Sequence, residues 1–178
     1  MLLMSRLHPT ALTALAAATL TMAAYAKSPA EWQALTGSAQ ISLEQAMQAS
    51  TKAVPGKVLE IEIDDGDGAG TRYEAEVLTA AGDEAEVWVN ATTGQATLHH
   101  NDGPAKRKHQ KRAADAKITM EQAIGAATAH TPGKAVKAKL DSHFGTTTYE
   151  VDVLQADHRV MEVKINAADG KVISSKRD

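Results

Sequence analysis

Two stretches of the sequence carry side chains that could bind a metal ion. Residues 64–70 read Asp-Asp-Gly-Asp-Gly-Ala-Gly, and carboxylates interrupted by glycines are typical of calcium loops. Counted from Asp65, however, the fifth position is Ala69, and the twelfth, Glu76, falls within a predicted strand. The pattern therefore favours a hairpin loop between two strands over a calcium site.

The second stretch contains imidazoles. His99, His100 and His109 flank the basic run 106–108, and histidines in a polar tract can hold Zn²⁺ or Cu²⁺. The basic run would repel a cation, and no second cluster fixes a coordination geometry. We therefore expect no metal or other cofactor, and keep a metal- or cofactor-linked accessory role of these histidines as the alternative.

Motifs for enzymatic chemistry are absent from the sequence. There is no H-E-x-x-H pair, no G-x-S-x-G elbow and no glycine-rich phosphate loop. The chain also contains no cysteine, which excludes thiolate catalysis, thiolate metal sites and disulfides. We expect a protein that is not an enzyme.

Six side chains are candidates for binding a protein partner. Trp88 alternates with inward-facing residues of a predicted strand, so it should point outward, where tryptophan either covers a neighbouring segment or anchors a partner. The other five are glutamates on the polar faces of predicted strands: Glu60, Glu62, Glu74, Glu76 and Glu86.

These residues are positioned by a sequence that occurs twice. Residues 41–57 and 118–134 share one pattern at a fixed spacing, and Tyr73 and Tyr149 continue the correspondence after the loss of one residue. An internal period of this kind defines the architecture before any other feature. Each copy should therefore form the same unit.

Each unit begins with a helix. Ser42 and Thr119 are followed three positions later by glutamine, which predicts a capping box, and Pro-Gly ends each helix. The apolar period then changes from 3.6 to 2, which predicts antiparallel strands with one buried face. The expected fold class is α+β, with two tandem repeats, each an N-terminal helix packed on a three- to four-stranded antiparallel sheet.

The termini and the connection between the repeats complete the organisation. Residues 1–26 combine an apolar run with a final Ala-Tyr-Ala and predict a signal peptide, hence a periplasmic or secreted protein without stable membrane insertion after cleavage. The expected domains are a loosely ordered N-terminal arm at 27–40, repeat 1 at 41–98, a basic, solvated linker at 99–117 and repeat 2 at 118–174. Trp32 and Leu35 in the arm are three positions apart, which allows a short helical turn docked on the first repeat.

The charge is small overall but unevenly distributed. A formal net charge of −3 argues against nucleic acid as a partner. The first repeat is acidic, the segment 99–117 is basic and the second repeat is balanced. Where the first copy has Glu60 and Glu62, the second has Lys137 and Lys139. Either these faces attract each other within the molecule, or both are independently solvated.

The order of these elements resembles the PepSY domain family. The resemblance rests on residues 118–124, on Pro132-Gly133-Lys134, on the strand 149–153 and on the turn 166–172, with the same elements in the first copy. It implies a noncatalytic module that binds or inhibits peptidases. The family often has aspartate where Asn90 and Asn166 stand, which we interpret as turn variation.

The sequence therefore predicts an exported, noncatalytic tandem PepSY protein that binds a protein partner and inhibits or regulates a peptidase. Since no peptidase domain follows in the sequence, we expect the partner to be a separate protein. A purely structural spacer is a third possibility. The sequence leaves the identity of the partner and the oligomeric state open.

Overall fold

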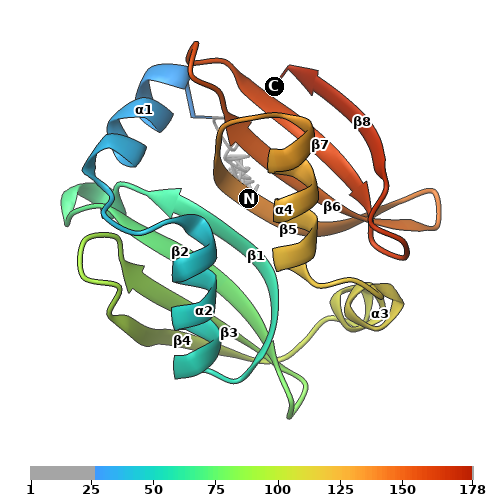
Figure 1. Ribbon diagram of the computed structural model, residues 1–178. Helices are drawn as coiled ribbons and strands as arrows, with labels where there is room; N and C mark the ends of the chain where they lie inside the picture. The colour runs from blue at the N-terminus through green and yellow to red at the C-terminus, as the bar shows by residue number, and fades with distance from the viewer. Residues whose placement is uncertain (1–26, 178) are drawn as a thin grey trace, which may run out of the picture.

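The computed structural model describes residues 27–177, so the expected signal peptide at 1–26 lies outside the described residues. The described chain forms one antiparallel sheet in the order β4-β3-β2-β1-β5-β6-β7-β8 (Figure 1). The α+β class and the tandem repeat of helix-then-strands are confirmed. The strands are β1 Gly56–Asp64, β2 Arg72–Thr79, β3 Asp83–Asn90, β4 Ala96–Pro104, β5 Lys134–His143, β6 Thr146–Leu154, β7 Val160–Asn166 and β8 Val172–Arg177.

The two predicted helices begin and end where the sequence indicates. Helix α2 spans Leu43–Ala53 and helix α4 spans Met120–His130, each opened by a complete capping box. The side chain of Ser42 accepts a hydrogen bond from the backbone of Gln45, whose own side chain accepts from the backbone N–H of Ser42 at 2.8 Å. Both exposed donors at the helix start are thereby satisfied.

The glycine after each helix is required for packing. A Cβ added to Gly56 would lie 2.3 Å from the carbonyl oxygen of Leu78, and one added to Gly133 would lie 2.4 Å from that of Leu154. The first residues of β1 and β5 therefore pass directly against the ends of β2 and β6. The Pro-Gly pair ends the helix and also permits this close approach.

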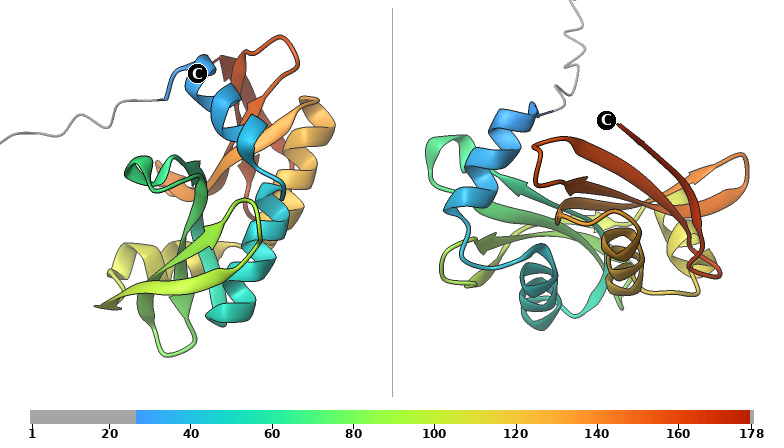
Figure 2. Two further views of the ribbon diagram at one scale, coloured as in Figure 1. Left: turned by 90° about the vertical axis from the view of Figure 1, so that its left-hand side faces the viewer. Right: turned by 45° about the horizontal axis from the view of Figure 1, so that its top comes forward.

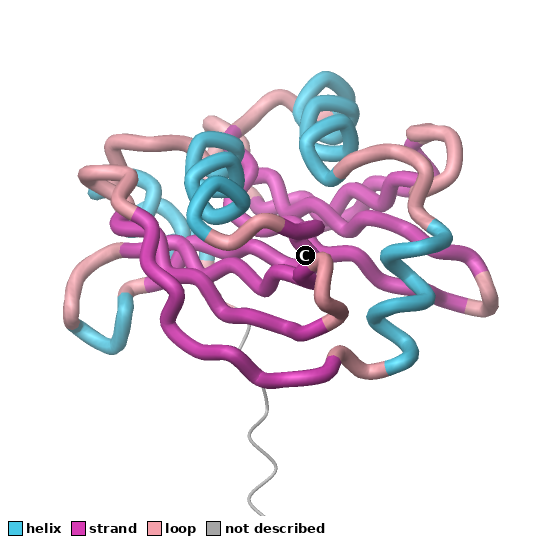
Figure 3. The backbone as a smooth tube through the Cα atoms, turned by 90° about the horizontal axis from the view of Figure 1, so that it is seen from below, coloured by secondary structure: helices cyan, strands magenta, loops and turns pink. Residues whose placement is uncertain are grey.

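Helices α2 and α4 cover the same face of the sheet, which buries the core (Figure 2, left; Figure 3). Both helices turn their apolar stripe toward the strands, whose alternate residues are fully buried. The largest fully buried side chains are Tyr149, Leu43, Ile61, Ile63, Ile124, Ile165, Val77, Val87, Val89, Val136, Val151 and Val153. No helix among residues 27–177 has the length and apolar character that a membrane crossing would need.

The two repeats join edge to edge into a continuous sheet. Strands β1 and β5 pair antiparallel with Glu60 opposite Lys139, Ile61 opposite Ala138 and Glu62 opposite Lys137. The ammonium of Lys137 lies 2.9 Å from the carboxylate of Glu60 and 2.5 Å from that of Glu62. Of the two alternatives for these faces, the structure favours attraction within the molecule.

The segments expected as an arm and a basic linker contain regular secondary structure. Residues 27–40 contain helix α1, Pro29–Ser38, and residues 99–117 contain the end of β4 and helix α3, Arg107–Asp115. Helix α1 precedes α2 as α3 precedes α4, so each repeat has a second helix. The repeating unit is therefore longer than the expected ranges, and β8 also continues past residue 174.

The additional helices lie beside the short junction between the repeats. Helix α1 packs on β1 and on β6 of the other repeat, whereas α3 packs on β5 and β1. Trp32 of α1 is 3% exposed and belongs to the core. At the corresponding place in α3, 77 positions later, stands His109. This substitution brings a titratable group to a place where the first helix has an apolar one.

Candidate functional site

The five predicted glutamates gather in one hollow. Glu60 and Glu62 from β1, Glu74 and Glu76 from β2, and Glu86 from β3 line an open hollow of about 240 Å³, with Asp102 at its border. They share a face because the residues that alternate with them on each strand turn toward α2 and α4. The acidic hollow, as we call it, therefore lies on the face of the sheet opposite these two helices.

Cations occupy one side of the acidic hollow. Lys137 contacts Glu60 and Glu62, and Lys27 contacts Glu62 and, at 2.9 Å, Asp64. Burial works against the charge of Lys137, but its hydrogen bond with Glu62 and the two neighbouring carboxylates outweigh it and raise the pKa of the ammonium. This side of the hollow is neutralised within the molecule.

The other side keeps more of its negative charge. Burial raises the pKa of the Glu74 carboxyl, although Arg72, 2.5 Å away, favours its ionised form. Burial also raises the pKa of Glu76, with a further contribution from the nearby charge of Glu84. A positively charged group entering here would relieve the repulsion between these carboxylates.

Trp88 borders the acidic hollow and is half-buried. Its ring lies between the guanidinium of Arg72, 3.6 Å from the ring centroid, and the imidazole of His99, stacked at 3.4 Å. Its indole N–H donates to Glu86 at 2.7 Å. His99, from the segment expected as a linker, covers one face of the ring, while the second repeat does not contribute to this stack. Both roles considered for Trp88 stay predictions.

The three histidines considered as metal ligands do not converge. His99 stacks on Trp88, His100 faces Asp102 at 3.6 Å, and His109 reaches back from α3 to the sheet. Among the described residues, no group of three potential ligands contains His99 or His100. A shared site of these three histidines has no geometric support.

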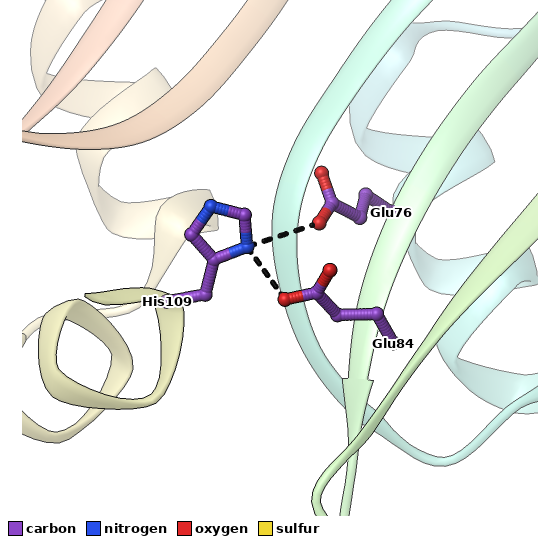
Figure 4. Close-up of side chains that lie close together, drawn as sticks. All are labelled: Glu76, Glu84 and His109. Atoms are coloured by element: carbon purple, nitrogen blue, oxygen red, sulfur yellow. Dashed lines mark hydrogen bonds and ion pairs between the residues drawn. The ribbon is translucent and has the colours of Figure 1, made fainter. Parts of the chain in front are cut away.

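His109 instead meets two glutamates (Figure 4). Its Nδ1 lies 2.5 Å from Oε1 of Glu84 on β3 and 3.4 Å from Oε1 of Glu76 on β2. Sequence reasoning missed Glu84, because its side chain is buried next to the equally buried Ala85 at a shift in the strand register. The burial pattern there does not alternate, so alternation cannot assign its face.

The acidic loop at residues 64–70 forms the predicted hairpin connection between β1 and β2. Two of its three carboxylates are engaged by the protein itself: Asp64 accepts from the backbone of Gly66 at 2.9 Å and pairs with Lys27, and Asp65 accepts from the backbone of Asp67 at 3.0 Å. These contacts are those of a self-capped turn. The hairpin interpretation is confirmed.

Comparisons with known proteins agree with the repeat. The PepSY family, described as "Peptidase propeptide and YPEB domain", matches twice, over residues 40–99 and 117–176. The chain is 33% identical over 136 residues to the "Uncharacterized protein YkoJ" of Bacillus subtilis (strain 168), with 76% of this chain and 74% of YkoJ covered.

A crystal structure from Clostridium difficile 630, of a protein designated a "putative lipoprotein", aligns with a TM-score of 0.43 at 15% identity. That alignment covers 79% of this chain and 95% of the other. The assignment rests on the twofold family match and the relative from Bacillus subtilis. The chain belongs to the PepSY family, of which it contains two domains in tandem.

Proposed function

We propose that this tandem PepSY protein is an exported, noncatalytic binding protein, periplasmic or secreted, that captures a peptidase through the acidic hollow and regulates it. PepSY domains are generally noncatalytic and propeptide-like, which supports a regulatory role. The observation that carries the proposal is the convergence of five glutamates from three strands, bordered by Trp88.

The chemistry of the hollow favours a basic segment of the partner. Glu74, Glu76 and Glu86 lie on the side where Lys27 and Lys137 do not reach them. A lysine or arginine placed among these carboxylates would gain charge-assisted hydrogen bonds and would lower the pKa of Glu76, which burial and the nearby charge of Glu84 raise. The indole of Trp88 adds an aromatic surface next to them, of the type that dominates many interfaces.

An inhibition assay tests the proposal. Purified secreted metallopeptidases are titrated with the protein, and the concentration that halves their activity is compared with that of a Glu74→Gln/Glu86→Gln variant. Loss of two charge-assisted contacts should raise that concentration at least roughly 100-fold, since each is worth about 1.5 kcal/mol or more. The matched control neutralises Glu44 and Glu121, which lie on α2 and α4 over the opposite face.

The control variant should inhibit as the unmodified protein does. If both double variants inhibit equally well, the acidic hollow is not the contact surface. If the protein neither binds nor slows any peptidase in the set, the regulatory role itself is wrong.

A further inference from the structure

Three potential metal ligands from three different elements meet beneath helix α3. They are His109 of α3, Glu84 of β3 and Glu76 of β2, and their ligand atoms all lie within 4.8 Å of one another (Figure 4). The side chains of His109 and Glu84 are only 15% and 10% exposed, and that of Glu76 is 32% exposed. We propose that these three residues bind a divalent transition-metal cation, with Zn²⁺ as the best match.

The equivalent place on the other side of the junction between the repeats shows that the fold does not need these ligands. By the repeat spacing, His109 corresponds to Trp32, Glu84 to Val160 and Glu76 to Asp152. The strand registers agree, because Glu84 stands opposite Leu78 on β2 and Val160 stands opposite Leu154 on β6.

Trp32 and Val160 are both core residues, 3% and 4% exposed. The short helix of one repeat is thus held by apolar packing where the other places an imidazole over two carboxylates. Burial of these ionisable groups is costly unless they are paired or coordinate a cation. In the equivalent set only Asp152 could serve as a ligand, so it lacks the histidine and the second carboxylate of the group under α3.

The distances fit a tetrahedral ion after a small adjustment. Ligand atoms at about 2.0–2.1 Å from Zn²⁺ are separated from one another by about 3.3 Å in a tetrahedral site. The 3.4 Å between Nδ1 of His109 and Oε1 of Glu76 already matches this separation. The 2.5 Å between Nδ1 of His109 and Oε1 of Glu84 must widen by roughly 0.8 Å to reach this separation. A rotation of the flexible glutamate side chain can provide this change.

Charge and space also favour a cation. A neutral imidazole with two carboxylates matches the nitrogen and oxygen ligands of zinc sites and carries a net negative charge. A cavity of about 330 Å³ adjoins Glu76 and His109 and has room for water as a fourth ligand. Two of the three basic side chains around that cavity pair with Asp141 and not with Glu76 or Glu84. Arg112 lies 2.5 Å and Lys139 3.9 Å from the Asp141 carboxylate. The third, Lys108, is exposed.

A second group of potential ligands consists of Asp141, His143 and Glu150. It differs from the first in the basic side chains that already pair with its carboxylates. Its carboxylates already hold cations of the protein, Arg112 on Asp141 at 2.5 Å and Lys164 on Glu150 at 2.6 Å. Its histidine is exposed. We therefore assign the metal site to the group under α3 alone.

Calorimetric titration of the untagged protein with zinc chloride tests the assignment. One Zn²⁺ should bind per chain. The variants His109→Gln and Glu84→Gln should each lower the affinity at least about 100-fold, since loss of a direct ligand exceeds the 10–100-fold effect typical of residues that only hydrogen-bond to a ligand. His100→Gln is the matched control, because His100 is an exposed histidine outside the group, and it should bind as the unmodified protein does.

A triple variant separates metal binding from folding. His109→Trp, Glu84→Val and Glu76→Asp together copy the equivalent set Trp32, Val160 and Asp152, so the protein should remain folded by circular dichroism and bind no Zn²⁺. Absence of binding by the unmodified protein, or binding that survives His109→Gln, would overturn the proposal. Because the titration contains no peptidase, its result is independent of the proposed capture of a partner.

Discussion

Replacing Lys137 with methionine measures how strongly the junction between the repeats depends on charge. The ammonium lies 2.9 Å from Glu60 and 2.5 Å from Glu62, and the Lys137 side chain is 28% exposed. Methionine keeps the apolar stem but leaves Glu60 without its lysine, while Glu62 retains Lys27. An exposed pair contributes about 0.2–1 kcal/mol, and breaking a buried one costs about 3–5 kcal/mol. Lys137 lies between these limits, so we expect the free energy of unfolding to fall by about 2 kcal/mol.

Urea unfolding at neutral pH, followed by circular dichroism, measures this loss. A thermal melt should show the midpoint falling by roughly 4–8 °C, given about 2–4 °C per kcal/mol for a chain of this size. A double-mutant cycle with Glu60→Gln should give a coupling of about 1 kcal/mol, because Glu60 is bound by Lys137 across the junction.

The pH dependence has a definite sign. Burial disfavours the ammonium of Lys137, but its glutamate partners outweigh burial and raise its pKa above the ordinary 10.5. The stabilisation by Lys137 should therefore be complete below the unfolded pKa and disappear as the pH rises through the folded one. The difference between the variant and the unmodified protein should be constant near neutrality and shrink in strong alkali.

Lys164→Met is the matched control. Lys164 also bridges two glutamates, Glu150 at 2.6 Å and Glu162 at 3.5 Å, but both belong to the same repeat as the lysine. It should lower stability by a similar amount without coupling to Glu60. A loss below about 0.5 kcal/mol for Lys137→Met, or no coupling to Glu60, would refute the reasoning and show that solvent screens the junction.

Three further predictions concern stability. Burial raises the pKa of Tyr73 and Tyr149 to about 12, so the free energy of unfolding should fall as the pH rises above about 10. Absorbance titration should find two phenols with midpoints near 12 unless the ionisation requires unfolding. Gly133→Ala should lower the free energy of unfolding, measured in urea, by more than about 2 kcal/mol, because the added Cβ would meet a carbonyl oxygen at 2.4 Å. Gly125→Ala, which has open space in α4, should instead raise it by up to about 1 kcal/mol. Equal effects of the two substitutions would contradict the packing argument. Trp32→Ala should lower the free energy of unfolding by about 3–5 kcal/mol. Trp32→Phe should lower it clearly less, because the indole N–H has no hydrogen-bond partner within the described structure. Equal losses for the two variants in chemical denaturation would contradict this expectation.

Local chemistry in the sequence was sufficient to predict the repeated core. The capping residues Ser42 and Thr119 and the following Pro-Gly pairs set the helix boundaries, and strict alternation assigned the faces of β1 and β2. For that reason the five glutamates were correctly expected on one polar face. Their convergence into a hollow also required the order of the strands in the sheet, which alternation does not give.

The spacing of Trp32 and Leu35 allowed a short helical turn in the arm, whereas helix α3 could not be predicted from residue identity. Trp32 and Leu35 of α1 correspond to His109 and Arg112 of α3, so the two helices share position but not composition. One is held by apolar packing and the other by contacts with Glu84 and Asp141. The pairing of His109 with Glu84 was missed for the same reason, because it depends on a helix whose sequence reads as a basic tract.

The charges at the junction between β1 and β5 also bear on which strands can pair with each other. Duplicated strands that pair antiparallel can in principle pair with their own copy in a neighbouring molecule, since the backbone geometry would be the same. Two β1 strands in this register would place Glu60 opposite Glu62 twice, and two β5 strands would place Lys137 opposite Lys139. Like charges directly opposite each other are destabilising. The divergence of the two copies at these positions therefore favours pairing of β1 with β5 and disfavours pairing of either strand with its own copy in a second molecule.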